Sequence, residues 1–151
     1  MKRPTLRTRK FPSVENVLGG KGVVGAKPRS SLDWVGMIRE GIPAAAVESV
    51  LSAVHVSQSE LAQTLGIPER TLARRKREGV LNSEESSKLL RLARVMSRAS
   101  EVFDGPAAAI DWLKSPNAAL RGNVPLSLLD TDIGAESVLD TLGRIEHGVF
   151  A

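Results

Sequence analysis

The sequence predicts an all-α protein, and three observations carry this prediction. Aromatic residues make up only 3% of the 151 residues and tyrosine is absent, so the core must come from leucine, valine, isoleucine and alanine. These residues recur at intervals of three and four, the spacing that places them on one face of a helix. No segment shows the strict alternation of a half-buried strand. The chain is long enough for one full domain or two small ones.

Composition also restricts the function. A net charge of +4 and a pI near 9.9 favour a polyanionic partner. The absence of cysteine excludes disulfides, zinc fingers and thiol catalysis, and it is compatible with a reducing cytoplasm. No apolar run approaches the ~18 residues that a membrane span needs. The basic N-terminus lacks the apolar region of a secretory signal. We therefore expect a cytoplasmic protein with no membrane partner.

Residues 1–30 are predicted to form a flexible basic arm. Eight lysines and arginines stand here against one acid, Glu15, and four glycines interrupt any helix across the second half. One interpretation is a solvated tail; the other is an arm that follows DNA phosphates or enters a minor groove. The Gly-Gly-Lys-Gly run at 19–22 lacks the full spacing of a phosphate-binding loop.

Two short amphipathic helices are predicted next, over residues 32–41 and from Pro43 to about Val54. In the first, Trp34 shares a packing face with nearby apolar residues. The second carries a stripe of valine and leucine at helical spacing, suited to lie beneath a pair of DNA-reading helices.

The stretch from Gln58 to Arg77 has the pattern of a helix-turn-helix. Ser57 and Glu60 have the spacing of a capping box at the start of its first helix. Gly66 can end that helix with a positive φ at no steric cost. An alanine where the helices cross, Gly66 four residues later and Leu72 six beyond that complete the pattern.

A longer helix is predicted from Asn82 to the Gly105–Pro106 stop, with Ser83 as its N-cap. Its apolar surface is too wide for one neighbour. At ~20 residues it would span about 30 Å, which is enough to join two lobes.

The second lobe is predicted to contain a helix over 106–114, single turns at 117–120 and 126–129, and a last helix over 133–147. The packed face of this last helix is expected to consist of Ile133, Val138, Leu142 and Ile145.

Several runs in the second half are specific enough to indicate a family. They include Phe-Asp-Gly-Pro at 103–106, Asp-Trp-Leu at 111–113 and, above all, Gly-Arg-Ile-Glu-His-Gly-Val-Phe at 143–150. With Thr-Leu-Ala-Arg-Arg-Lys at 71–76, they make residues 40–151 closely resemble the Xre/MbcA/ParS-like antitoxins. Residues 1–30 are not covered by this resemblance.

The resemblance implies an antitoxin encoded beside a RES-domain toxin that destroys NAD⁺. Such an antitoxin blocks the toxin's active site and binds operator DNA to repress its own operon. The chain then divides into the arm at 1–30, an Xre-like helix-turn-helix domain at 31–96 and a toxin-binding domain at 97–151. The alternative is a stand-alone repressor or partition-type DNA-binding protein without a toxin partner.

Seven residues are predicted to contact DNA. Arginine forks grip guanine or phosphate bidentately, a threonine methyl can touch thymine, and the start of a helix can hold a phosphate. The seven are Ser57, Gln58, Arg70, Thr71, Arg74, Arg75 and Arg77. Arg75 stands where helix-turn-helix patterns usually place an apolar residue. Either Arg75 points outward because the helix rotates, or the domain presents DNA differently from common repressors. The alternative for the whole set is a basic helix that is merely solvated.

A homodimer is expected, because one small helix-turn-helix makes few contacts and two copies on a two-fold axis double them. The interface could come from the excess apolar surface of residues 89–103 or from the segment around Trp34. Core packing is the competing use of both.

Five residues are predicted to bind the toxin. A pocket for NAD⁺ should hold cationic and aromatic groups, so the ring of Phe150 and the free carboxylate of Ala151 could occupy it. Val149 belongs to the same tail, and Arg144 and His147 could hold the pocket rim. The alternative is that Val149 and Phe150 fold back onto the core of their own lobe.

Catalysis has little support in the sequence. The two histidines, His55 and His147, fall in different predicted lobes, and no Ser–His–Asp arrangement or nucleotide cradle is evident. We therefore expect no enzymatic activity, no metal site and no cofactor.

Overall fold

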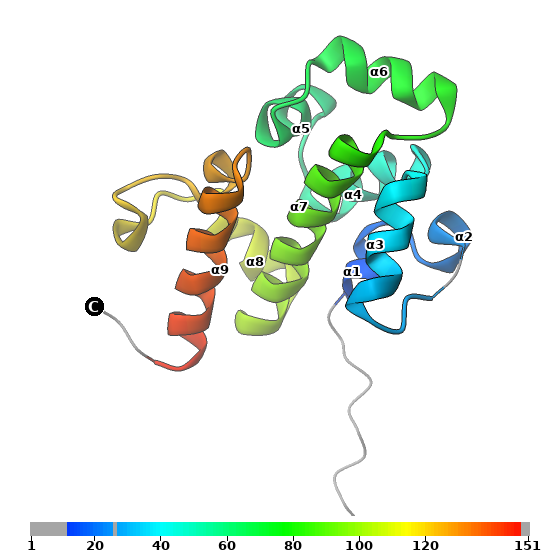
Figure 1. Ribbon diagram of the computed structural model, residues 1–151. Helices are drawn as coiled ribbons and strands as arrows, with labels where there is room; N and C mark the ends of the chain where they lie inside the picture. The colour runs from blue at the N-terminus through cyan, green and yellow to red at the C-terminus, as the bar shows by residue number, and fades with distance from the viewer. Residues whose placement is uncertain (1–11, 26, 149–151) are drawn as a thin grey trace, which may run out of the picture.

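The computed structural model describes residues 12–25 and 27–148, and this part of the chain consists of helices and connecting turns (Figure 1). In chain order these are α1 (Val14–Val17), α2 (Lys21–Val24), α3 (Ser31–Glu40), α4 (Ala45–Val54), α5 (Gln58–Leu65), α6 (Glu69–Glu78), α7 (Ser83–Val102), α8 (Pro106–Leu113), the 3₁₀ turns η1 (Ala118–Leu120) and η2 (Pro125–Leu128), and α9 (Asp132–Glu146). The all-α prediction is confirmed. Within the same ranges, no helix combines the length and the hydropathy needed to cross a membrane.

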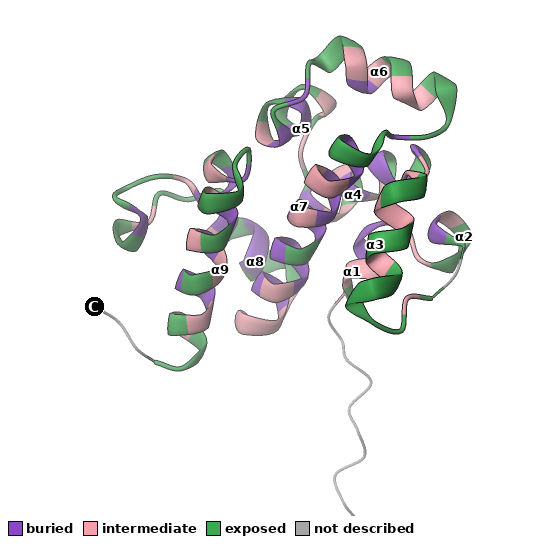
Figure 2. Ribbon diagram, viewed as in Figure 1, coloured by how far each residue is buried: buried purple, intermediate pink, exposed green. Residues whose placement is uncertain are grey.

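The long helix α7 is the centre of the structure. Helices α8 and α9 pack on it from one side, and α1, α3 and α4 pack on it from the other (Figure 1). Eleven of its twenty residues are buried, and they appear in Figure 2 as purple segments between pink and green ones. The prediction of a helix that joins two lobes is confirmed. Its N-cap is Asn82 rather than Ser83, because the Asn82 side chain accepts from the backbone N–H of Glu85 at 2.8 Å.

The prediction of a flexible arm over residues 1–30 is wrong for the segment that forms α1 and α2. Ser13 caps α1, and Val17, Leu18 and Val24 are buried in the shared core. Helix α1 packs against both α4 and α7. The glycines between the helices, with positive φ at Gly19 and Gly20, turn the chain back instead of releasing it. Residues 1–11 and 26 lie outside the described residues.

The helix-turn-helix forms as predicted from α5, a turn and α6. Ser57 and Glu60 make the capping box, and Gly66 leaves α5 with a φ of 68°. After α6, the chain passes close to the segment before α4: Ala44 N–H donates to Gly79 O at 2.9 Å, and Leu81 N–H donates to Ile42 O at 3.0 Å.

In the second lobe, the helix and turns appear at the predicted places, and Thr131 caps α9. The predicted packed face of α9 is only partly right. Val138 and Leu142 are fully buried, whereas the Ile133 residue is 77% exposed. At 100° per residue, Ile133 lies about 140° around the helix from Val138, so the two cannot share a face. Ala135 takes the buried position instead.

Candidate functional site

The outer face of α6 carries a stripe of exposed arginines. Arg70, Arg74 and Arg77 are spaced four and three residues apart, so they share one face, opposite the buried Leu72. Arg74 pairs with Glu78 at 3.3 Å across one helical turn in an exposed contact. Within the described ranges, Arg70 and Arg77 have no hydrogen-bond or ion-pair partner. The stripe is therefore available to a polyanion.

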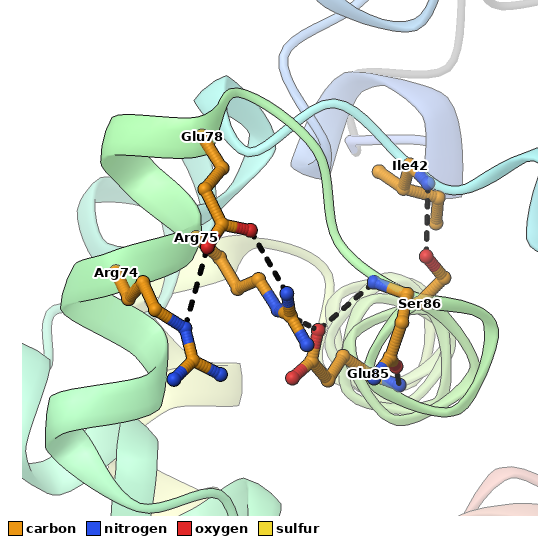
Figure 3. A network of polar contacts seen from close by, with 7 residues as sticks. Ile42, Arg74, Arg75, Glu78, Glu85 and Ser86 are labelled. Atoms are coloured by element: carbon orange, nitrogen blue, oxygen red, sulfur yellow. Dashed lines mark hydrogen bonds and ion pairs between the residues drawn. The ribbon is translucent and has the colours of Figure 1, made fainter.

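Arg75 turns away from this stripe and towards α7 (Figure 3). Its Nε donates to Glu85 Oε1 at 2.8 Å, and a terminal nitrogen donates to Glu78 Oε2 at 2.9 Å. The hydrogen bonds that the guanidinium donates to Glu78 and, next in effect, to Glu85 raise its pKa. Its side chain is 21% exposed. Arg75 thus fills the usual apolar position as a paired, inward-facing cation, which neither sequence interpretation anticipated.

The start of α5 is largely occupied by contacts of its own. The Ser57 hydroxyl accepts from Glu60 N–H, and Ser57 N–H donates to Glu60 Oε1, both at 3.1 Å. Both bonds lower the pKa of Glu60, and the bond from the Ser57 backbone N–H has the larger effect. The Gln58 side-chain oxygen accepts from Lys76 Nζ at 2.9 Å, and Lys76 also pairs with Glu48. The Ser57 side chain is therefore engaged in capping α5, and the Gln58 side chain links α5 to α6 through Lys76.

The second candidate surface is the C-terminal end of α9. Arg98 of α7 forms a bidentate ion pair with Glu146, and both nitrogen–oxygen distances are 2.8 Å. Arg144 and His147 are exposed beside this contact, with His147 Nε2 3.9 Å from Glu146 Oε1. Val149, Phe150 and Ala151 lie outside the described residues. The end of α9 and the α6 stripe lie at opposite ends of the molecule (Figure 1).

The Arg98–Glu146 contact gives α9 a pH-dependent anchor. The hydrogen bonds from Arg98 lower the pKa of Glu146 below its usual 4.5. A carboxylate whose pKa falls on folding stabilises the fold above its unfolded pKa, and this contribution is lost as the pH falls through the folded value. We expect Glu146→Gln to lower the melting temperature at pH 7 and the difference from the wild type to vanish well below pH 4.5. Thermal unfolding of both proteins across this range tests it; a difference that does not change with pH would contradict it.

Charge is unevenly divided along the chain. Residues 98–151 contain eight acidic and four basic side chains, which gives them a net charge of −4. Because the whole chain has a net charge of +4, the first 97 residues have a net charge of +8. A polyanion is therefore attracted to the first 97 residues rather than to the remainder, and five of these positive charges stand in residues 1–11.

Within the described ranges, no cluster of His, Asp and Glu side chains is arranged to hold a metal ion. His55 ends α4 with a φ of 58°, and its carbonyl accepts from Lys114. His147 ends α9.

Comparisons with known proteins match both halves. The family described as "Antitoxin Xre-like helix-turn-helix domain" matches residues 33–94, and "Antitoxin Xre/MbcA/ParS C-terminal toxin-binding domain" matches residues 98–148. "Antitoxin Xre" of Yersinia enterocolitica is 37% identical over 119 residues, 78% of this chain and 80% of the relative. "Prs ADP-ribosylating antitoxin" of Sphingobium is 30% identical over 132 residues, 81% and 83% of the two chains. The M. tuberculosis MbcT–MbcA toxin–antitoxin complex contains a chain of similar fold, with a TM-score of 0.55, 24% identity and coverage of 72% of this chain and 96% of that one.

Proposed function

This chain belongs to the Xre/MbcA/ParS antitoxin family, and on that premise we propose that it neutralises a NAD⁺-consuming RES-domain toxin and binds operator DNA to repress its own operon. The observation that carries the proposal is the placement of two unlike surfaces at opposite ends of the molecule. The cationic face of α6 is far from the end of α9 (Figure 1). One protein can therefore hold DNA and a toxin at the same time.

For operator DNA, we propose Arg70, Arg74 and Arg77 as the principal contacts, because they share the outward face of α6. Thr71, in the first turn of the same helix, is half-buried and lies close enough in sequence to join them. Backbone N–H groups at the start of α5 can hold a phosphate beside Ser57 and Gln58. Arg75 is left out of this set because its guanidinium is engaged with Glu78 and Glu85.

For the toxin, we propose that Arg144 and His147 contact the rim of its pocket and that the segment Val149, Phe150 and Ala151 enters it. The exposure of Arg144 and His147 beside the anchored end of α9 supports this role. The name of the Sphingobium relative refers to ADP-ribosylation, a reaction whose donor is NAD⁺. A pocket for NAD⁺ must accept its pyrophosphate and an aromatic ring, and an aromatic side chain such as Phe150 can take the place of the latter.

A homodimer is part of the proposal, because a two-fold pair of α6 helices would read a palindromic operator. Exposed apolar side chains on α3, above all Leu32 at 78% exposure, support an interface outside the core.

Co-expression with the neighbouring open reading frame tests the toxin half. Driven from an unrelated promoter, the neighbour alone is expected to deplete NAD⁺ and arrest growth, and the full chain is expected to prevent both and to co-purify with it. Deleting Val149–Ala151 should abolish protection, whereas Arg70→Gln with Arg77→Gln should protect as the wild type does. Full protection by the deletion variant would refute entry of the tail into the pocket. A neighbour that neither depletes NAD⁺ nor co-purifies would favour the stand-alone repressor.

A further inference from the structure

Helix α6 buries a single apolar side chain and makes several polar contacts with its neighbours. Leu72 is the one residue of α6 that is buried. The polar contacts from α6 to its neighbours are the ion pair from Arg75 to Glu85 at 2.8 Å, the bond from Lys76 to Gln58 at 2.9 Å and the ion pair from Lys76 to Glu48. A single apolar anchor leaves rotation about the helix axis weakly defined, so the polar contacts must fix the orientation of α6.

Glu85 is a buried acid that accepts hydrogen bonds from two different elements. Its residue is 6% exposed, and its Oε1 accepts from Arg75 Nε at 2.8 Å and from Asn82 N–H at 2.9 Å. The second bond closes the capping box of α7. A buried carboxylate is costly unless a cation and hydrogen bonds compensate it. Arg75 of α6 supplies this cation. It stands at the position where helix-turn-helix motifs usually have an apolar residue.

The first turn of α7 is itself firmly attached to the core. The neighbouring Ser86 hydroxyl is fully buried and accepts from Ile42 N–H at 2.8 Å (Figure 3). Leu89, one turn further along, is also fully buried. A side chain of α6 that binds Glu85 is therefore attached to a helical turn anchored in the buried core.

We propose that Arg75 is a positioning residue, whose ion pair with Glu85 sets the rotation at which α6 presents Arg70, Arg74 and Arg77 to operator DNA. The inference rests on the operator binding proposed above. Base reading by arginine forks requires placement within about 0.5 Å and 10–20°, whereas attraction to phosphates tolerates much more. Loss of the pair should therefore reduce specific binding more than non-specific binding.

The experiment uses Arg75→Met and Glu85→Gln, singly and together, in the full chain. Methionine is unbranched and fills the space without charge. Glutamine keeps the oxygen that accepts from Asn82 N–H and from Arg75 Nε, so α7 remains capped, but it removes the negative charge that pairs with the guanidinium. Arg77→Gln is the matched control for a direct DNA contact. Anisotropy titrations measure affinity for a duplex from the promoter upstream of the chain's own gene and for a shuffled duplex of equal composition, with circular dichroism as the check of folding.

Each single change is expected to weaken promoter binding about tenfold and to change shuffled-duplex binding by no more than about threefold. The double variant should bind no more weakly than the weaker single variant, because both changes act on the same contact and their effects should not add. Arg77→Gln should weaken binding to both duplexes, because it removes an exposed positive charge that attracts phosphates whatever the sequence.

The informative variant is Glu85→Gln, because a buried residue of α7 cannot contact DNA and its change keeps size and cap. A folded Glu85→Gln protein with wild-type affinity for both duplexes overturns the inference, even if Arg75→Met fails to fold. Equal losses on both duplexes by Arg75→Met alone would make Arg75 a direct contact and also overturn it. A wild type that does not distinguish the promoter from the shuffled duplex would instead remove the DNA half of the proposed function, and this inference with it.

Discussion

Replacing Gly134 with alanine is expected to lower the free energy of unfolding by about 3 kcal/mol, at the upper end of typical overpacking costs. Gly134 lies in the first turn of α9, where this helix meets the end of η2. A Cβ atom there would stand 1.8 Å from the carbonyl oxygen of Leu128 and 2.8 Å from its carbonyl carbon. Both are backbone atoms, so no side-chain rotation relieves the clash. The melting temperature should fall by roughly 6–12 °C at ~2–4 °C per kcal/mol.

Gly143 of the same helix provides the matched control. Nothing lies within 4 Å of the Cβ that Gly143→Ala would add, and the backbone there is helical. This change should stabilise the protein by up to ~1 kcal/mol through helix propensity. Because the Gly134 clash pushes α9 away from η2, Gly134→Ala should also weaken binding to the co-expressed partner. If denaturation curves give Gly134→Ala and Gly143→Ala the same free energy of unfolding, the predicted clash at Gly134 is wrong.

The elements that sequence predicts well are those that local chemistry specifies. The capping box at Ser57, the positive φ at Gly66 and the break between helices at Gly105 depend only on residues within a few positions. The segment of α1 and α2 was missed because its burial depends on surfaces of α4 and α7 that come later in the chain. The glycine-rich run suggests a tail, although Gly19 and Gly20 form a turn between the buried Leu18 and Val24.

The candidate sites were predictable only in part, since charge is visible in a sequence and its partner is not. Five successive positions of α6 include four basic residues, and nothing local separates the inward Arg75 from the outward Arg74 and Arg77. The hydrophobic face that includes Leu72 gives a hint, because Arg75 lies three residues beyond it and therefore on the same side. The contact of Arg98 with Glu146 joins residues 48 positions apart, and no spacing rule reveals it.

Removing Arg70 and Arg77 together is expected to weaken operator binding about a hundredfold. Each well-placed arginine contact is worth ~1–3 kcal/mol, and two such losses at ~1.4 kcal/mol per tenfold give this factor. Arg70→Gln with Arg77→Gln should leave the melting temperature unchanged, because both side chains are exposed and have no partner in the described part of the chain. Fluorescence anisotropy with promoter DNA at several salt concentrations measures the effect. The slope of log affinity against log salt should decrease by about 0.9 per lost phosphate contact.

The charge-matched control for this pair is Arg94→Gln with Arg121→Gln, which also removes two exposed arginines that have no partner within the described ranges. Arg94 lies on α7 and Arg121 follows η1, so neither belongs to α6. If net charge alone attracted DNA, both pairs would weaken binding equally, since each lowers the charge by two. A loss confined to the α6 pair identifies a specific surface. If the α6 variant binds the operator within about threefold of the wild-type affinity, the loss is smaller than that expected for one good arginine contact. This result would show that α6 does not carry the DNA site.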